Sequence, residues 1–455
     1  MINADLLITH ARVWDEESQA LSAAETSVAI HEGKILKIGN QQDLAETYAA
    51  ARRWDAAGKL LLPGFVNTHC HLFQVFMRGL GKDLPFMDWV HQSVRLIMPL
   101  LDEEAVYLAA LMGCFEAIRT GTTTLVDFMY ANVKPRMADA VLKAFDDCGI
   151  RGILGRGVTD VEWLPGSTVP SITYAPVQDS LADLERLMTT YRNHPRISFM
   201  LAPNVIWAMT RDGLAELARY AESRQLTVSM HLLETKDDDE YSQEKYGMRT
   251  TRLLEKVGVL NTNFLAVHVI QAQDEDVELL ARYCAKVSYN PTANMILGSG
   301  VAPVPELWRR GIPIGLGTDG AASNDCQSLI EAMKSAVLLQ RVHRHDPTAL
   351  SARQAFAMAT SQGARAMHMD DQVGSLKPGM RADILVVDLD QPNTTPCYDP
   401  IASLVYSGSE RNISSVFVQG QLVLEAGQIT CLDEAALIRG AHQKARDLFQ
   451  RAYAR

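Results

Sequence analysis

Residues 60–71 read LLLPGFVNTHCH. The apolar run predicts a buried strand over Leu60–Asn67 that ends in polar residues. His69 and His71 lie two positions apart, so on an extended chain both imidazoles point to the same side and can meet one metal ion. Cys70 between them faces the other way and is interpreted as a packing residue. The stretch therefore predicts a strand that leads directly into a metal site.

Seven further apolar runs follow, separated by longer amphipathic segments, and this alternation is typical of repeated βα units around a parallel sheet. The runs are Thr122–Phe128, Gly152–Gly157, Ile197–Asn204, Thr227–His231, Phe264–Val269, Ala285–Asn290 and Ile312–Asp319, with helix-like segments such as Glu103–Arg119, Ala138–Cys148, Asp212–Arg224 and Asp274–Cys284 between them. Eight units between residues 59 and 371 match the size of an α/β protein of the (β/α)₈ (TIM) barrel type.

Both ends of the chain differ from this middle part. Residues 1–58 and 372–435 contain short β-rich runs with glycine turns, such as Glu32-Gly33-Lys34 and Gln419-Gly420-Gln421. Short ribbons cannot bury a face alone, so the two ends are expected to form one small composite β-sandwich. Residues 436–455 are predicted to form a C-terminal helix.

Composition narrows the class of protein. The 455 residues carry 43 Lys and Arg against 54 Asp and Glu, a net charge of −11, which disfavours a nucleic-acid binder and favours a small-molecule partner. The start, MINADLLITH, does not resemble a secretory signal, and no apolar stretch approaches the roughly 18 residues of a membrane span. Seven scattered cysteines disfavour a disulfide framework and a cysteine zinc site. A cytoplasmic location without membrane contact is expected.

Other polar residues end later strands of the predicted barrel: His231 with Glu234 three positions on, then His268, then Asp319. Each has an ordinary alternative, because a single histidine is usually a hydrogen-bonded core residue and an aspartate after Gly-x-Gly-Thr usually caps a loop. Barrels assemble active sites at the carboxyl ends of their strands, however, and these residues occur there in order. Imidazoles with one carboxylate suit zinc or another first-row divalent ion.

These residues lie in motifs that resemble the amidohydrolase superfamily, in the branch of chlorohydrolases, deaminases of purines, pterins and s-triazines, and methylthioadenosine/S-adenosylhomocysteine deaminases. The motifs are LLPGFVNTHCH, MHLLET, AVH, LGSGVAPVPELWRRGIPIGLGTDGAASND, SLKPGMRADILVVDLD and YDPIASLVYSG, which together span nearly the whole chain. The resemblance implies a barrel with a composite β-sandwich, a homo-oligomer, and one Zn²⁺ per subunit, with Fe²⁺ or Mn²⁺ as alternatives. The implied ligands are His69, His71, His231 and Asp319.

The resemblance also implies catalytic roles. Asp319 would accept a proton from the metal-activated water, His268 would fix and polarise that water, and Glu234 would protonate the ring nitrogen beside the carbon under attack. A His-x-x-Glu pair alone is weak evidence for this role of Glu234, and the evidence is strengthened by the other implied metal ligands. The predicted activity is zinc-dependent removal of an exocyclic amino group from a purine, pterin or s-triazine.

Departures from the family pattern bear on the substrate. Methylthioadenosine/S-adenosylhomocysteine deaminases typically hold ribose with a Glu after the strand-one loop and a His after strand four. Here the first region is the apolar stretch 98–101, followed by Asp102 and Glu103, and the second position is Asn204. In strand seven Tyr289 and Ile296 replace a His and a Lys, which favours a flatter, less charged substrate. Deamination of an adenosine thioether is the alternative, and triazine dechlorination a less favoured one.

Several side chains are candidates for substrate contact. Arg78 could bind an anionic substituent or pair structurally, and Trp89 could line the pocket or anchor its loop. The predicted substrate-binding residues are Gln74, Arg78, Trp89, Asn204 and Tyr289, with Met77, Trp163 and Trp207 as further candidate walls. A non-catalytic metal-binding scaffold is disfavoured because Glu234 and Asp319, which can move protons, accompany the ligands.

Overall fold

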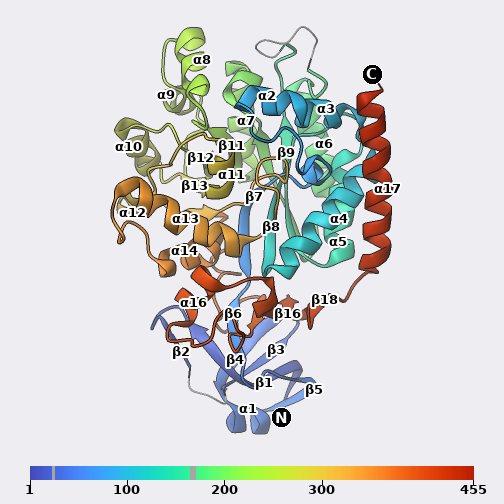
Figure 1. Ribbon diagram of the computed structural model, residues 1–455, viewed down its shortest axis with the longest axis vertical. Helices are drawn as coiled ribbons and strands as arrows, with labels where there is room; N and C mark the ends of the chain where they lie inside the picture. The colour runs from blue at the N-terminus through green and yellow to red at the C-terminus, as the bar shows by residue number, and fades with distance from the viewer. Residues whose placement is uncertain (23–25, 164–170, 455) are drawn as a thin grey trace.

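The computed structural model describes residues 1–22, 26–163 and 171–454. Eight parallel strands form a barrel in the upper part of Figure 1, in the order β14-β13-β12-β11-β10-β9-β8-β7. They are β7 (Phe65–Cys70), β8 (Thr122–Met129), β9 (Arg151–Val158), β10 (Ile197–Pro203), β11 (Val228–Leu232), β12 (Phe264–His268), β13 (Lys286–Tyr289) and β14 (Ile314–Leu316). The predicted (β/α)₈ fold is confirmed.

The barrel closes between its first and last strands through side-chain and loop hydrogen bonds. The Thr68 hydroxyl donates to the Leu316 carbonyl over 3.0 Å, and the Asp319 N–H donates to the His69 carbonyl over 3.0 Å. Strands β8 and β9 are buried along their whole length, as expected for parallel strands covered on both faces. The closure brings the ends of β7 and β14 together at the barrel mouth.

Helices cover the outside of the barrel and cross its mouth. The outer helices are α4 (Glu103–Arg119), α5 (Met137–Cys148), α6 (Val177–Thr190), α7 (Arg211–Arg224), α8 (Lys236–Tyr246), α9 (Thr250–Lys256), α10 (Asp274–Arg282), α11 (Pro291–Ile296), α12 (Val304–Arg309), α13 (Leu329–Arg344), α14 (Ala352–Ala359) and α15 (Ser361–Ala366). The long loop after β7 carries η1 (Leu72–Met77), α2 (Phe86–Gln92), α3 (Val94–Ile97) and η2 (Met98–Leu100), and α2 and α3 lie above the barrel in Figure 1.

The two ends of the chain meet in a second, mostly antiparallel sheet of ten strands, seen below the barrel in Figure 1. Its path is β18-β17-β16-β15-β6-β1-β3-β4, with β2 and β5 paired to β1. The strands are β1 (Ile2–Asp15), β2 (Ala20–Leu21), β3 (Thr26–His31), β4 (Lys34–Asn40), β5 (Tyr48–Asp55), β6 (Leu60–Pro63), β15 (Ile384–Val387), β16 (Ile413–Val418), β17 (Gln421–Glu425) and β18 (Gln428–Ile429). Helix α1 (Gln41–Thr47) packs against this sheet, whereas α16 (Pro400–Ser407) packs against α13 and α14.

One boundary corrects the sequence prediction. Leu60–Asn67 was expected to be a single barrel strand, but it breaks at Gly64 into β6, which belongs to the terminal sheet, and β7, which opens the barrel. The Gly64 N–H donates to the Asp383 carbonyl over 3.0 Å, and a Cβ at this position would lie 2.1 Å from the Thr123 hydroxyl oxygen. The chain therefore passes between the two sheets where only glycine fits.

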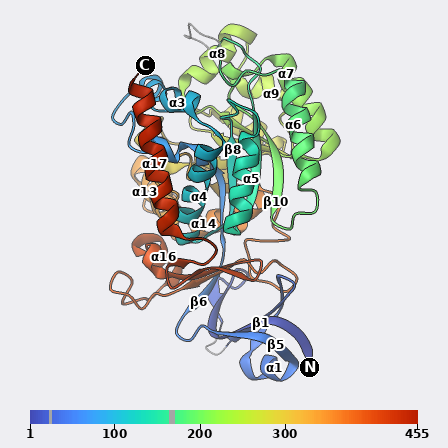
Figure 2. The same ribbon diagram turned by 90° about the vertical axis from the view of Figure 1, so that its right-hand side faces the viewer.

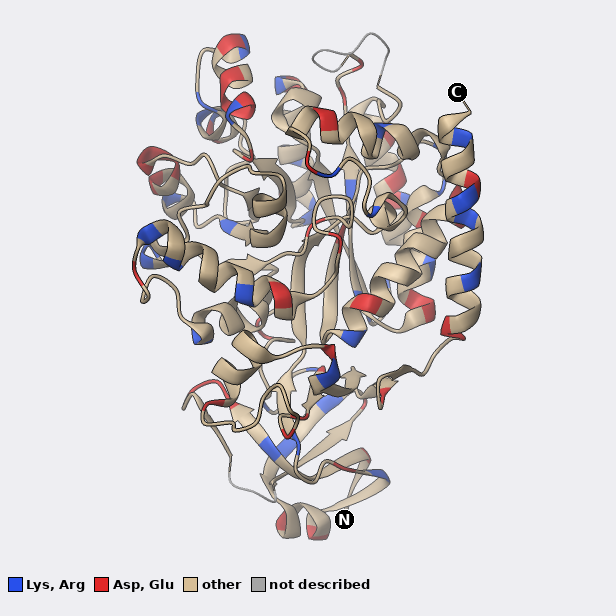
Figure 3. Ribbon diagram, in the orientation of Figure 1, with Lys and Arg blue, Asp and Glu red and all other residues tan. Residues whose placement is uncertain are grey.

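The C-terminal helix α17 (Glu434–Tyr453) runs along α4, as the view in Figure 2 shows. Lys444 bridges to Asp102 over 2.9 Å, and Arg119 of α4 pairs with Glu434. In the part of the chain that the structure describes, none of the helices has the length and apolar character needed to cross a membrane. Figure 3 shows positive and negative residues interspersed along the outer helices.

Candidate metal centre and active site

Four histidines and an aspartate from different strands converge at the barrel mouth. His69 lies in β7, His71 directly after it, His231 in β11, His268 at the end of β12, and Asp319 after β14. The potential ligand atoms of His69, His71 and Asp319 lie within 4.8 Å of one another, as do those of His69, His231 and His268. All five side chains are buried. The structure thus brings together every residue of the predicted metal and water site.

The backbone turns sharply where these strands end. Leu233, His268, Val269 and Asp319 have φ angles of 53°, 73°, 55° and 62°, in the left-handed region that non-glycine residues seldom adopt. Such conformations cost about 1–3 kcal/mol each and cluster at functional sites. They turn the chain away from the strand direction at the barrel mouth.

Two of the imidazoles are oriented by backbone carbonyls. His71 donates its Nδ1–H to the Phe128 carbonyl over 2.8 Å, and His231 donates its Nδ1–H to the Asn204 carbonyl over 2.7 Å. Because a carbonyl can only accept, each neutral ring keeps its lone pair on Nε2. The two Nε2 atoms face each other 3.3 Å apart, an arrangement that a cation between them stabilises.

The charge state of the cluster also suits a cation. Burial lowers the pKa of His69 to about 4 and those of His71 and His231 to about 3, so the imidazoles are neutral at physiological pH. Burial alone would raise the pKa of Asp319, yet the His69 side chain, whose Nε2 lies 3.5 Å from an Asp319 carboxylate oxygen, holds it well below its usual range. Both ring nitrogens of His69 are buried without a hydrogen-bond partner among the described residues. These residues therefore fit a divalent metal ion.

Glu234 stands beside this cluster. Its carboxyl oxygen lies 3.6 Å from Nε2 of His268, and His268 donates its Nδ1–H to the Asn294 side-chain oxygen over 2.9 Å. Burial raises the pKa of Glu234 to about 7, so this carboxyl group can both hold and release a proton near neutral pH.

A buried carboxylate that the sequence analysis missed holds the Glu234 loop. Asp238 accepts the N–H of Glu234 over 2.9 Å, the N–H of Thr235 over 3.3 Å and the indole N–H of Trp207 over 3.2 Å. Thr235 and Asp238 form a capping box at the start of α8, a Thr-x-x-Asp signal that is readable in the sequence. The Asp238 carboxylate thus links the backbone of Glu234 to Trp207, an aromatic wall of the cavity.

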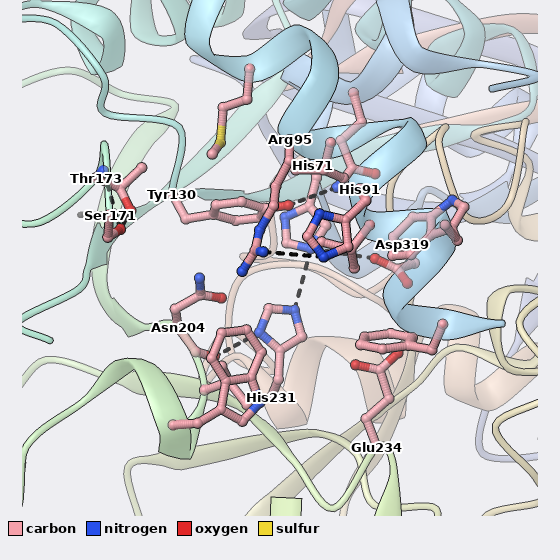
Figure 4. A pocket seen from close by; sticks show the side chains of 18 of the residues that line it. His71, His91, Arg95, Tyr130, Ser171, Thr173, Asn204, His231, Glu234 and Asp319 are labelled. Carbon is pink, nitrogen blue, oxygen red and sulfur yellow. Dashed lines mark hydrogen bonds and ion pairs between the residues drawn. The ribbon is translucent and has the colours of Figure 1, made fainter. Parts of the chain in front are cut away.

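A cavity of about 430 Å³ opens over the cluster, and Figure 4 shows part of its lining. Gln74, Trp89 and Asn204 line it, as does the candidate wall Trp207. Trp89 does both of the things considered for it. It lines the cavity, and its indole N–H anchors the loop by donating to the Ala322 carbonyl over 3.0 Å.

Tyr130, which the sequence analysis did not select, also lines the cavity. Its hydroxyl accepts from the Gln74 side-chain nitrogen over 3.0 Å, and its ring packs edge-on against His71 with centroids 4.9 Å apart. Burial raises the pKa of this phenol, so it stays protonated. Tyr130 follows β8, and strand-end position was the signal that could have identified it.

Other expected contacts lie outside the cavity. Arg78 pairs with Glu116 over 2.5 Å, and Tyr289 is fully buried in the layer between strand and helix, where its hydroxyl accepts from Gln340 over 3.1 Å. Asp102 caps α4 and pairs with Lys444, so it is not available to hold a sugar. Met77 is buried in the core and Trp163 is exposed. Arg78 and Tyr289 therefore do not line this cavity.

Neutral imidazoles, a carboxylate and a buried glutamate gathered at the strand ends of a (β/α)₈ barrel are typical of a metal-dependent hydrolase. The chain belongs to the amidohydrolase family, whose model matches residues 60–423.

Curated relatives share the full length of the chain. It is 33% identical to the 5-methylthioadenosine/S-adenosylhomocysteine deaminase of Nitratidesulfovibrio vulgaris over 95% of both chains. It is also 33% identical to the 5'-deoxyadenosine deaminase of Methanothermobacter thermautotrophicus, over 98% of this chain and 100% of the relative.

Solved structures agree with the fold. A zinc-bound adenosine deaminase from Xanthomonas campestris superposes with a TM-score of 0.90 at 27% identity, over 100% of both chains. The atrazine chlorohydrolase of Arthrobacter aurescens, at 24% identity and a TM-score of 0.89 over 97% of this chain and 100% of that one, shares the fold. The predicted family and the predicted class, a hydrolase of carbon–nitrogen bonds in cyclic amidines, are confirmed by these relationships.

Proposed function

We propose that this chain is a zinc-dependent aminohydrolase that removes an exocyclic amino group from a nitrogen heterocycle, with a purine as the first candidate and a pterin or s-triazine as others. The observation that carries this proposal is the position of Glu234, a buried carboxyl group with a pKa near 7, 3.6 Å from His268 at the edge of the ligand cluster. A group that exchanges a proton near neutrality is what protonation of a ring nitrogen requires.

His69, His71, His231 and Asp319 would hold the metal ion. When bound, such an ion supplies Lewis acidity that lowers the pKa of water from about 15.7 toward about 7. Three neutral imidazoles and a carboxylate are a common donor set for zinc, and Fe²⁺ and Mn²⁺ accept the same groups.

Different side chains carry out the separate proton transfers of the proposed reaction. Glu234, protonated, donates to the ring nitrogen beside the amino-bearing carbon, which makes that carbon electrophilic. His268, held by Asn294, presents its Nε2 to the attacking water, and Asp319 accepts the proton that this water loses. The water oxygen adds to the ring carbon as a hydroxyl group, Asp319 returns the proton to the amino nitrogen, and the carbon–nitrogen bond breaks to release ammonia. The hydroxyl proton then passes to Glu234, which leaves a neutral carbonyl group on the ring and restores the protonated acid.

Deamination of an adenosine derivative is the second candidate. Relatives that share a third of their residues over the whole chain are named for methylthioadenosine, S-adenosylhomocysteine and 5'-deoxyadenosine. The cavity differs from the pattern expected for ribose recognition, because Asn204 and the apolar stretch 98–101 occupy the regions where the resemblance places the sugar-binding His and Glu, and Asp102 is committed elsewhere. An adenosine substrate would therefore need other groups to bind its hydroxyls.

Ammonia release by the zinc-loaded protein tests these candidates. The panel pairs guanine, 8-oxoguanine, isoxanthopterin, melamine and ammeline with adenosine, methylthioadenosine and S-adenosylhomocysteine, and chloride release from a chlorotriazine is followed in parallel. Turnover of free rings supports the first candidate, and turnover confined to adenosine derivatives establishes the second. Absence of ammonia release from every compound, by protein with a full complement of metal, refutes the proposal.

The predicted domain boundaries and homo-oligomeric state stay predictions, which limited proteolysis and light scattering test.

A further inference from the structure

One arginine points into the cavity without a carboxylate partner. Arg95 lies in α3 and extends between Tyr130 and His91 in Figure 4. Its Nη1 lies 3.4 Å from Nε2 of His91, which belongs to α2. Arg95 is the one Lys or Arg side chain among the described residues that line the cavity. Among these residues, no carboxylate lies within ion-pair distance of it.

The other cations of the same loop are neutralised. Arg78 pairs with Glu116 over 2.5 Å, and Lys82 pairs with Asp325. Arg95 has no such partner among the described residues, and its neighbours Val94 and Met98, which also line the cavity, are apolar. Burial lowers the pKa of its guanidinium, which nevertheless keeps its charge because arginine does not deprotonate in proteins. A half-buried cation among apolar walls is stabilised by an anion that enters the cavity.

The cavity's own carboxylates cannot serve as that anion. Asp319 belongs to the ligand cluster, and Glu234 faces His268. Asp238 already accepts hydrogen bonds from Trp207 and from two backbone N–H groups. The positive charge of Arg95 is therefore left for a ligand.

We infer that Arg95, with His91 beside it, forms a subsite for a carboxylate on the substrate, so that the heterocycle presents the ring nitrogen beside its amino-bearing carbon to Glu234 and an acidic substituent to α3. The guanidinium fork matches a carboxylate through two parallel hydrogen bonds, a geometry that an ammonium group cannot reproduce. This inference rests on the proposed function for the placement of the amino group. It differs from the sequence-based expectation of a flatter, less charged substrate and assigns the anion-binding role to Arg95 in place of Arg78.

The carboxylate could belong to the ring itself or to a tail attached to a nucleoside, and two substrate pairs separate these sources. Pterin-6-carboxylate and pterin differ by a carboxylate on the ring. S-adenosylhomocysteine and methylthioadenosine differ by an amino-acid tail. For each pair, kcat/KM for deamination and Kd by titration calorimetry are measured with the zinc-loaded wild-type protein and with Arg95→Met, Arg95→Lys and Arg78→Met.

We expect the wild-type protein to prefer the carboxylated member of at least one pair. Arg95→Met should reduce this preference about 10- to 100-fold, the effect of losing charge-assisted hydrogen bonds, and Arg95→Lys should restore it only in part. Arg78→Met is the matched control, because it removes an arginine of the same loop that already has a partner, and it should leave the preference within about twofold.

Equal kcat/KM and equal Kd within both pairs would overturn the inference. So would a preference that survives in Arg95→Met, or one that Arg78→Met abolishes. If the wild-type protein deaminates none of the four compounds, the proposed function fails for these substrates, and the Kd values alone decide the subsite. In that case, a carboxylate preference in binding that Arg95→Met abolishes supports the carboxylate subsite, and the absence of any such preference refutes it.

Discussion

Replacing Glu234 with glutamine should reduce activity and stabilise the metal-free protein at alkaline pH. The pKa of this carboxyl group rises from 4.5 to about 7 because it is buried, and no hydrogen-bond donor to it is found in the described structure. A raised pKa means that folding favours the protonated form. The contribution of protonated Glu234 to the free energy of unfolding is fully present below pH 4.5, declines as the pH rises toward 7, and is absent above pH 7.

The shift from 4.5 to about 7 corresponds to about 3 kcal/mol, at about 1.36 kcal/mol per pKa unit. Glutamine has the same shape without the charge, so the advantage of Glu234→Gln over the wild-type protein should grow by up to about 3 kcal/mol between pH 4.5 and pH 8.5. Because the proposed mechanism uses Glu234 as an acid and base, kcat should fall about 10²- to 10⁴-fold while bound zinc is retained.

The assay is urea unfolding of metal-free protein followed by tryptophan fluorescence at several pH values, with steady-state kinetics of the zinc-loaded form. Metal-free protein is needed because a bound cation would itself shift the pKa of Glu234. Glu240→Gln, a matched change at an exposed glutamate of α8, should show no comparable pH-dependent gain. A stability difference between Glu234→Gln and wild type that does not change with pH would refute the reasoning, as would undiminished kcat.

Three further perturbations follow from the structure. Asp238→Asn leaves an amide facing three N–H donors, so it should cost about 1–3 kcal/mol and lower kcat more than it alters KM by displacing Glu234; unchanged kcat in a folded variant contradicts this. Removing the metal with a chelator should lower the melting temperature, since ligand at about 1,000 times Kd contributes about 4 kcal/mol, and zinc should restore it; equal melting of both forms contradicts a metal centre in the cluster. Gly64→Ala places a Cβ against Thr123 and should cost about 1–3 kcal/mol in urea unfolding, whereas Gly440→Ala within α17 should be neutral or stabilising; equal effects would contradict the packing argument.

The barrel and the convergence of the histidines and Asp319 at its mouth could be predicted from the sequence because strand ends fix where side chains go. His69, His231 and Asp319 each follow an apolar run, and parallel strands bring such ends to one mouth. Alternation along β13 could also have placed Tyr289 correctly. The Ser288 hydroxyl lies 2.7 Å from the Thr68 hydroxyl inside the barrel, so its neighbour Tyr289 points outward toward α13.

The loop after β7 shows where sequence reasoning stops. Arg78 and Arg95 both lie in it, and no periodic pattern distinguishes them. Their roles depend on the path of the loop. The helical conformation is interrupted at Ser93, between α2 and α3, and the loop places Arg78 within reach of Glu116. These are long-range contacts that local residue order does not encode.

The place of β6 in the terminal sheet has a consequence for synthesis on the ribosome. β6 pairs with β1, which emerges early, and with β15, which begins only at Ile384. The last barrel strand, β14, ends at Leu316, so the barrel can close while one edge of β6 still lacks its partner. That apolar edge is open to pairing with other chains until the C-terminal strands emerge. Chains that stop before Ile384 should consequently aggregate even though they contain every residue of the metal cluster.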